Sequence, residues 1–169
     1  MRVWIAVMAV ALIAMAGTAR AKDTVQQFKT VEAKHFKEAE GVELSPAFAD
    51  YFYAELRNEL TKAKLSSEVI GEGEAVDDSD AAKSAVITGT ITEYKKGSVV
   101  KSALIGFGAG MRSLKMDADV VRRSDSQNLC VLHVHVKVQP RWDEKIMAKW
   151  AAKQMVNEMK KALKERQSS

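Results

Sequence analysis

Three segments of the chain alternate apolar with polar residues, beginning at Ala85, Leu114 and Cys130. An alternation of period two predicts a strand with one buried and one open face. Turn-forming residues 123–128 separate the second segment from the third, so these two strands are expected to form an antiparallel hairpin. The open face of the sheet would then carry Thr88, Thr90, Asp117, Asp119, His133 and His135.

Centring this hairpin on Ser126 pairs Asp119 with His133 and Asp117 with His135. A register shift of one residue would place apolar side chains opposite polar ones. A shift of two residues keeps both faces, so the sequence leaves that register as an alternative. Cys130 shares the apolar parity of the third segment, which predicts a small buried side chain. It is the only cysteine of the sequence, which excludes an intramolecular disulfide.

Two helices are predicted from the spacing of apolar residues. Ser45-Pro46 is typical of a helix start, and the apolar spacing continues to about Lys64. A second helix follows Pro140, with Trp150 as a core anchor in an apolar stripe that comprises Ile146, Trp150, Met155, Met159 and Leu163.

Weaker strand signals span 24–32 and 65–70, and residues 71–82, rich in Gly, Asp and Glu, predict a solvated loop. Together with the helices, these segments predict an α+β fold. We expect a two-layer sandwich: a mostly antiparallel sheet of four to five strands with two helices packed on one face.

Residues 1–21 are typical of a cleaved secretory signal. Arg2 precedes an apolar run that is short for a bilayer span of about 20 residues, and Ala19 and Ala21 suit signal peptidase. The mature chain, 22–169, would be one domain in the periplasm, and it would not be lipidated because no cysteine lies near the cleavage site. Losing Arg2 and Arg20 lowers the formal net charge from +4 to +2, so nucleic-acid binding gains no support.

The segment from Gly97 to Arg112 joins two predicted strands and alternates apolar residues with glycines. It lacks the spacing of a phosphate-binding loop, so neither a nucleotide nor another cofactor is predicted. The apolar parity changes after Met111, which requires a bulge or bend near Arg112. An irregular packed crossover and a contact with a protein partner or a membrane both fit this pattern. The candidate contact residues are Gly97, Ser98, Lys101, Ile105, Gly106, Phe107, Gly108, Gly110 and Arg112.

Part of this region resembles the signature of a bacterial envelope family called domain of unknown function 4410. The matching runs are Ile87-Thr88-Gly89-Thr90-Ile91-Thr92-Glu93-Tyr94, Gly97-Ser98 and Leu104-Ile105-Gly106-Phe107-Gly108-Ala109-Gly110. The resemblance implies an envelope location and a fold similar to that of the curli secretion subunit, and the family, mostly predicted lipoproteins, has no assigned activity. The chain departs from the family at Lys101, near a position where Arg is frequent, and in lacking the lipidated cysteine.

The expected function is therefore a non-enzymatic envelope binding or assembly module. It would contact an envelope protein or the outer-membrane surface. A homo-oligomer is a further alternative, and one form of it is a pore whose spanning strand would be 99–111. The alternative is a metal-dependent hydrolase. His133 and His135 project from the same face of one strand, and two acids on the neighbouring strand would complete a ligand set of His133, His135, Asp117 and Asp119.

We expect export to leave a chain that begins at Lys22, because Ala19-Arg20-Ala21 matches the small-residue pattern that signal peptidase cleaves. The intact mass of the periplasmic protein measures this directly. Recovery of a chain that still starts at Met1 in the membrane fraction would contradict the prediction.

Overall fold

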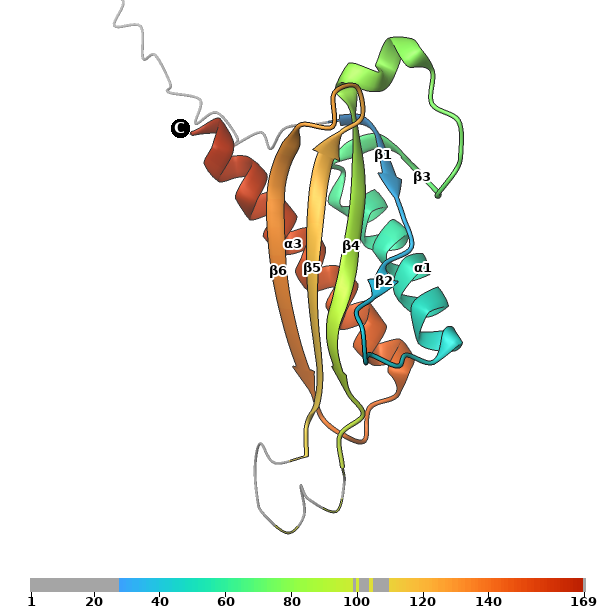
Figure 1. Ribbon diagram of the computed structural model, residues 1–169. Coiled ribbons are helices and arrows are strands. Elements are labelled where there is room, and N and C mark those ends of the chain that lie inside the picture. The colour runs from blue at the N-terminus through green and yellow to red at the C-terminus, as the bar shows by residue number, and fades with distance from the viewer. Residues whose placement is uncertain (1–27, 99, 101–103, 105–109, 169) are drawn as a thin grey trace, which may run out of the picture.

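The computed structural model describes residues 28–98, 100, 104 and 110–168. It has an α+β fold in which two helices pack against one mixed sheet that is not closed (Figure 1). The predicted fold class is confirmed, while the predicted signal lies outside the described residues. The elements are β1 (Phe28–Ala33), β2 (Lys37–Glu38), α1 (Pro46–Ala63), β3 (Ser66–Ile70), the 3-10 helix η1 (Asp78–Lys83), β4 (Ser84–Lys95), β5 (Arg112–Arg122), β6 (Asn128–Val138) and α3 (Glu144–Gln167).

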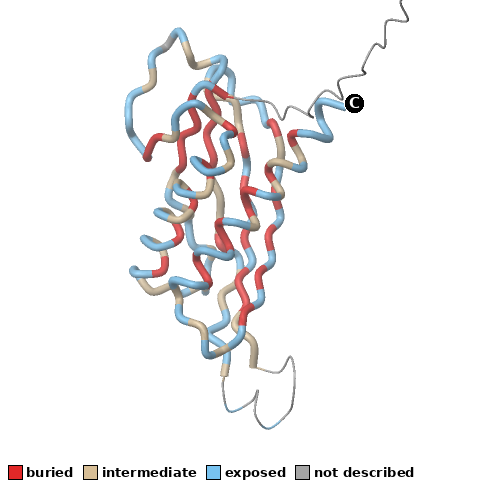
Figure 2. The backbone as a smooth tube through the Cα atoms, turned by 180° about the vertical axis from the view of Figure 1, so that it is seen from behind, coloured by how far each residue is buried: buried red, intermediate tan, exposed pale blue. Residues whose placement is uncertain are grey.

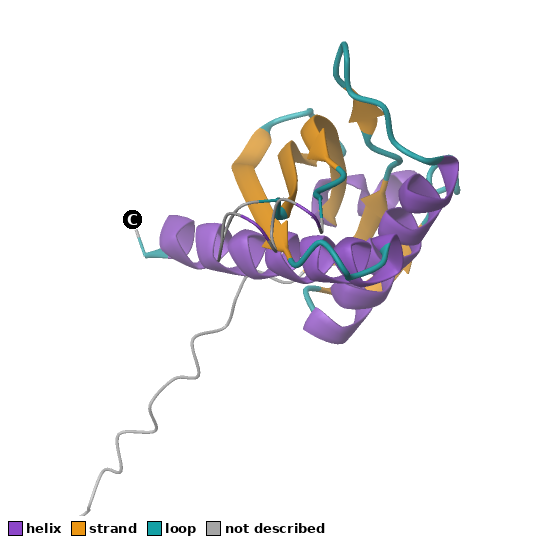
Figure 3. Ribbon diagram, turned by 90° about the horizontal axis from the view of Figure 1, so that it is seen from below, coloured by secondary structure: helices purple, strands orange, loops and turns teal. Residues whose placement is uncertain are grey.

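The sheet has six strands in the order β3-β1-β4-β5-β6, and β2 also pairs with β4. The long ladders β4–β5 and β5–β6 are antiparallel, as expected, whereas β1 pairs with β3 and β4 in parallel and β2 with β4 likewise. The parallel part arises because α1 connects β1 to β3, and a helical crossover returns the chain in the same direction. Seen from below, α1 and α3 lie along one side of the strands (Figure 3).

The hairpin has the predicted parity but a register two residues away from the one centred on Ser126. Asp117 lies opposite His133, and Val120 lies opposite Cys130. The difference originates in the turn, where the Arg122 N–H donates to the Gln127 carbonyl and Ser126 adopts a left-handed φ of 55°. A register shift beside Val120 follows, so the ladder is centred earlier in the chain than a symmetric turn at Ser126 would place it.

The core lies between the helices and the sheet, and buried segments gather where these layers meet (Figure 2). Ser45 caps α1 by accepting from the Phe48 N–H, as its position predicts. The predicted apolar stripe of α3 is confirmed in the second half of the helix and wrong in the first half. Ile146 and Trp150 are exposed, Trp150 by 49%, because Met147 and Ala151 point to the sheet in their place.

The loop after β3 covers one end of the sheet face that lies opposite the helices. Residues 71–83 include η1, which contacts β1, β4 and β5. Glu32 is buried there and forms an ion pair with Arg123, and Thr30 is buried beside it. The expectation of a wholly solvated loop and a wholly open face is therefore wrong at this end, while Asp117, Asp119, His133 and His135 are exposed as predicted.

Phe36 packs across the central strand at Gly89. It lies between β1 and β2, where one extra residue separates the pairs Ala33–Ile87 and Lys37–Thr90. A Cβ atom on Gly89 would come within 2.3 Å of the Phe36 ring and 2.6 Å of the Asp117 carbonyl oxygen. The glycine is required because the ring and a neighbouring backbone occupy the space of a side chain.

Gly89→Ala is expected to destabilise the fold by about 1–3 kcal/mol, as overpacking in a core does. Urea unfolding measures the change. Phe36→Leu should recover part of it in the double variant, because the nearest clashing atom then moves away. Thr92→Ala, on an exposed position of the same strand, is the control, and a Gly89→Ala variant as stable as this control would contradict the packing.

Candidate functional site

The two ends of the crossover between β4 and β5, residues 97–98 and 110–112, are called its roots, and a backbone hydrogen bond holds them together. Gly97 and Gly110 both have positive φ, 71° and 78°, and the Ser98 N–H donates to the Gly110 carbonyl at 2.7 Å. The bend predicted near Arg112 is thus at Gly110, and a separate register shift lies between Ile91 and Glu93. The structure describes four of the nine predicted contact residues, and Lys101, Ile105, Gly106, Phe107 and Gly108 lie outside the described residues.

Glu144 joins three elements near these roots. It lies in the first turn of α3, and its carboxylate accepts from the Tyr94 hydroxyl at 3.0 Å and from the Ser45 hydroxyl at 2.5 Å. Burial, followed by the hydrogen bond to Glu144, raises the pKa of Tyr94 to about 12. The Arg112 guanidinium also donates to the Pro140 carbonyl. The end of the sheet that carries the crossover is therefore fixed to both helices.

Glu93 forms a polar cluster on the other side of the same end. Its carboxylate accepts from the Ser113 hydroxyl at 2.8 Å and from the Lys115 and Lys95 ammonium groups at 3.1 and 3.2 Å. The hydrogen bond from Ser113, followed by those from the two lysines, lowers the pKa of Glu93 to about 2. These groups join β4 to β5 just before the crossover leaves the sheet.

The open face brings together only part of the predicted metal set. His133 Nδ1 lies 2.7 Å from an Asp117 carboxylate oxygen, whereas His135 lies opposite Lys115 and Asp119 opposite Val131. Asp119 instead accepts from the Asn128 amide. Within the part of the chain that the structure describes, no cluster of three His, Cys, Asp or Glu side chains could hold a metal ion.

Among the described residues, β6 pairs with β5 alone, and no strand lies along its other edge. The Ile87 carbonyl accepts from the Lys34 N–H, so odd-numbered residues of β4 direct their backbone groups towards β1 and β2. The alternation of an antiparallel sheet carries this pattern across β5. The residues of β6 whose N–H and C=O groups reach the free edge are therefore Val131, His133, His135 and Lys137.

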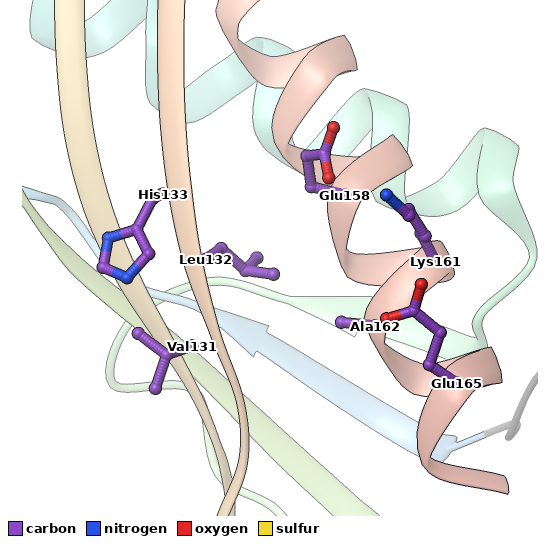
Figure 4. A pocket seen from close by; sticks show the side chains of 7 residues that line it. All are labelled: Val131, Leu132, His133, Glu158, Lys161, Ala162 and Glu165. Carbon is purple, nitrogen blue, oxygen red and sulfur yellow. The ribbon is translucent and has the colours of Figure 1, made fainter. Parts of the chain in front are cut away.

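A shallow groove follows this free edge between β6 and α3 (Figure 4). Val131 and His133 point from the strand to the open face, while Leu132 points towards α3. Val131 is 52% exposed, and charged side chains of α3 form the opposite wall. The lining residues are Val131, Leu132, His133, Glu158, Lys161, Ala162 and Glu165.

The polar contacts at the end of the sheet that carries the crossover could not be recognised from the sequence. Glu93 and Ser113 are brought together by the β4–β5 register, and Glu144 meets Tyr94 across 50 residues of chain. For the groove beside β6, the sequence signal was the alternation that predicts the strand, but alternation does not reveal which strand lies at an edge. Cys130 is partly buried, and this burial raises the pKa of its thiol to about 11, which agrees with a small apolar role.

The family model described as Domain of unknown function (DUF4410) matches residues 14–135. No curated protein matches the chain. Two structures of PelC dodecamers from Paraburkholderia phytofirmans, one of them a point variant, are similar in fold. Their TM-scores are 0.58 and 0.56 at 10% identity, over 83% and 78% of this chain and 89% and 87% of the PelC chain.

The hypothetical protein CT253 from Chlamydia trachomatis is also similar, with a TM-score of 0.50 at 11% identity over 79% of this chain and 97% of its own. At this identity the likeness shows the fold alone. The detail of a fold like that of the curli secretion subunit is not confirmed by these comparisons.

We expect Ser113→Ala to raise the pKa of Glu93 from about 2 towards the ordinary 4.5, because the Ser113 hydroxyl makes the largest contribution to lowering it. Carboxyl NMR titration measures this pKa. A depressed folded-state pKa means that the contribution of Glu93 to stability is present above about pH 4.5 and is lost as the pH falls towards 2. Ser126→Ala, in the hairpin turn, is the control, and an unchanged Glu93 titration in Ser113→Ala would exclude this cause.

Proposed function

The chain belongs to the family described as Domain of unknown function (DUF4410), and on that basis we propose that it is a non-enzymatic assembly module of the bacterial envelope. Its copies associate through the free edge of β6 and the groove beside it. The module is exported to the periplasm by a cleaved signal, and it is not lipidated.

The free edge of β6 is the observation that carries this proposal. The strand has 11 residues, and four of them direct backbone donors and acceptors to the edge, beside an exposed Val131. An unpaired edge of this length is a template for a further strand unless it is covered. The groove residues Lys161 and Glu158 give such a strand charges of both signs to meet.

The similar PelC structures support self-association as the mode of assembly. Both are dodecamers, and they share the fold over most of this chain. A chain that presents a different surface at each contact forms a ring or a filament. Pairing of the β6 edge with a different surface of the next copy is such a contact, and the opposite edge strand β3 is a different surface, with five residues against the 11 of β6.

The alternative of a metal-dependent hydrolase has no support in the described part of the chain. Its four predicted ligands do not converge, because His135 and Asp119 lie opposite other residues. No helix among the described residues has both the length and the apolar character needed to cross a membrane.

The proposal is tested by the mass of the purified chain in light scattering after gel filtration. Wild type should run as a multiple of the monomer mass, and Val131→Lys should shift it towards the monomer, because a charge at the free edge opposes strand addition.

Thr92→Lys provides the matched control, since it places the same charge on an exposed position of β4, a strand with neighbours on both sides. This variant should keep the mass of wild type. A monomeric wild type at all concentrations, or equal loss of assembly in both variants, would overturn association through the β6 edge.

A further inference from the structure

Exposed apolar side chains gather at one end of the molecule. In the described residues, Val100 and Leu104 of the crossover are 65% and 80% exposed. Tyr51 lies near the start of α1 and Ile146 near the start of α3, and both helices begin at the end of the sheet from which the crossover leaves (Figure 1). Trp150 follows one turn after Ile146. Isolated exposed apolar residues need no explanation, whereas exposed apolar residues in contact with one another are typical of an interaction site.

The aromatic rings at this end, which include the partly buried Trp142, are already arranged as a surface. Trp142 and Trp150 stack with their centroids 6.2 Å apart, and the Lys153 ammonium lies 5.8 Å from the Trp150 ring. The Lys145 ammonium lies 5.9 Å from the ring of Tyr51, so the surface extends from α3 to α1. We call it the aromatic–lysine surface: Tyr51, Trp142, Lys145, Ile146, Lys149, Trp150 and Lys153.

Within the described part of the chain, the lysines of this surface are not paired with an acid. Lys145, Lys149 and Lys153 are exposed, and they take part in none of the ion pairs found among the described residues. The acids at the start of α3 are engaged elsewhere: Asp143 caps the helix through the Ile146 N–H, and Glu144 accepts from Tyr94 and Ser45. The result is a positive helix face around two tryptophans.

We propose that the aromatic–lysine surface binds an anionic lipid surface, an inference that rests on the proposed location in the envelope. Tryptophan rings favour the headgroup level of a bilayer, and lysine stems lie along apolar surface while their ammonium groups reach phosphates. The spacing of Ile146, Lys149, Trp150 and Lys153 places all four on one face of α3. This face is the convex outside of a helix, which fits a broad lipid surface rather than a peptide that needs a groove.

The fluorescence of the tryptophans in this surface can report its binding to lipid. The sequence has three tryptophans, of which Trp142 and Trp150 belong to the surface and Trp4 to the N-terminal apolar segment. In the exported chain, which begins at Lys22 and so lacks Trp4 and the apolar signal segment, fluorescence therefore reports the aromatic–lysine surface alone. Vesicles of phosphatidylcholine with phosphatidylglycerol should shift the emission to the blue, and brominated lipid should quench it. Vesicles of phosphatidylcholine alone should do neither.

Charge reversal tests the role of the lysines. Lys149→Glu with Lys153→Glu should weaken binding to phosphatidylglycerol vesicles at least about tenfold, since each lysine contributes separately to attraction by an anionic surface. Lys64→Glu with Lys83→Glu changes the net charge equally at exposed positions near the end of α1 and in η1, at the opposite end of the molecule, and should bind as wild type does. Trp150→Ala, at a half-exposed position, should weaken binding without loss of the fold.

No shift with phosphatidylglycerol vesicles would overturn the proposal, as would equal losses in the two charge-reversed variants. If the chain captures an acidic envelope protein but does not bind these vesicles, the surface is a site for a protein partner, and this outcome would also overturn the proposal. The mass of the same variants in light scattering separates this outcome from the proposed function. Lys149→Glu with Lys153→Glu leaves the β6 edge intact and should keep the assembled mass.

Discussion

The packing of Phe36 over Gly89 is the contact on which the arrangement of layers depends. The ring lies where the chain passes from β1 to β2, both of which pair with β4. It crosses β4 at Gly89 and meets Phe52 of α1 edge to face at 5.1 Å. One side chain thus relates the parallel part of the sheet, the long antiparallel ladder and a helix. The same contact explains why a glycine stands inside a strand of threonines and isoleucines, where it would otherwise weaken the strand.

Because both helices are used to cover this face, the opposite face and the β6 edge must be stabilised by other means. At one end the loop 71–83 covers buried Glu32, whose charge is compensated by Arg123. At the other end Glu93 and Glu144 hold the crossover roots to the sheet and to the helices through hydrogen bonds. Between these ends the face carries exposed pairs such as Asp117 with His133, and near the edge it carries Val131. The surfaces available for contact are those that neither the helices nor this loop covers.

The sequence is informative where a local period determines burial, and less so where partners come from distant segments. Alternation predicted the three long strands, and Ser45-Pro46 predicted the start of α1. Cys130, predicted to be buried, is partly buried. The register came out two residues off because parity cannot detect a bulge inside a turn. Trp150 was placed in the core because its spacing continues the apolar stripe of the second half of α3, whereas Met147 and Ala151 are the buried residues of the first half. Neither the edge position of β6 nor the convergence of Ser45, Tyr94 and Glu144 has a local signal, since both follow from strand order.

The two proposed contacts use opposite halves of α3, which makes them compatible in one assembly. The groove beside β6 takes Glu158, Lys161 and Glu165 from the second half, and the aromatic–lysine surface takes Lys145 to Lys153 from the first. With about 1 kcal/mol for each lysine near an anionic surface, three lysines hold one copy only briefly. Copies joined in a ring, each through its β6 edge to a different surface of the next, would present several such surfaces at once, and every contact after the first would be intramolecular. If the rotation between copies directs these surfaces to one side, weak lipid binding by a single chain becomes stable binding by the assembly. Loss of assembly in Val131→Lys should then weaken vesicle binding too, although no residue of the aromatic–lysine surface has changed.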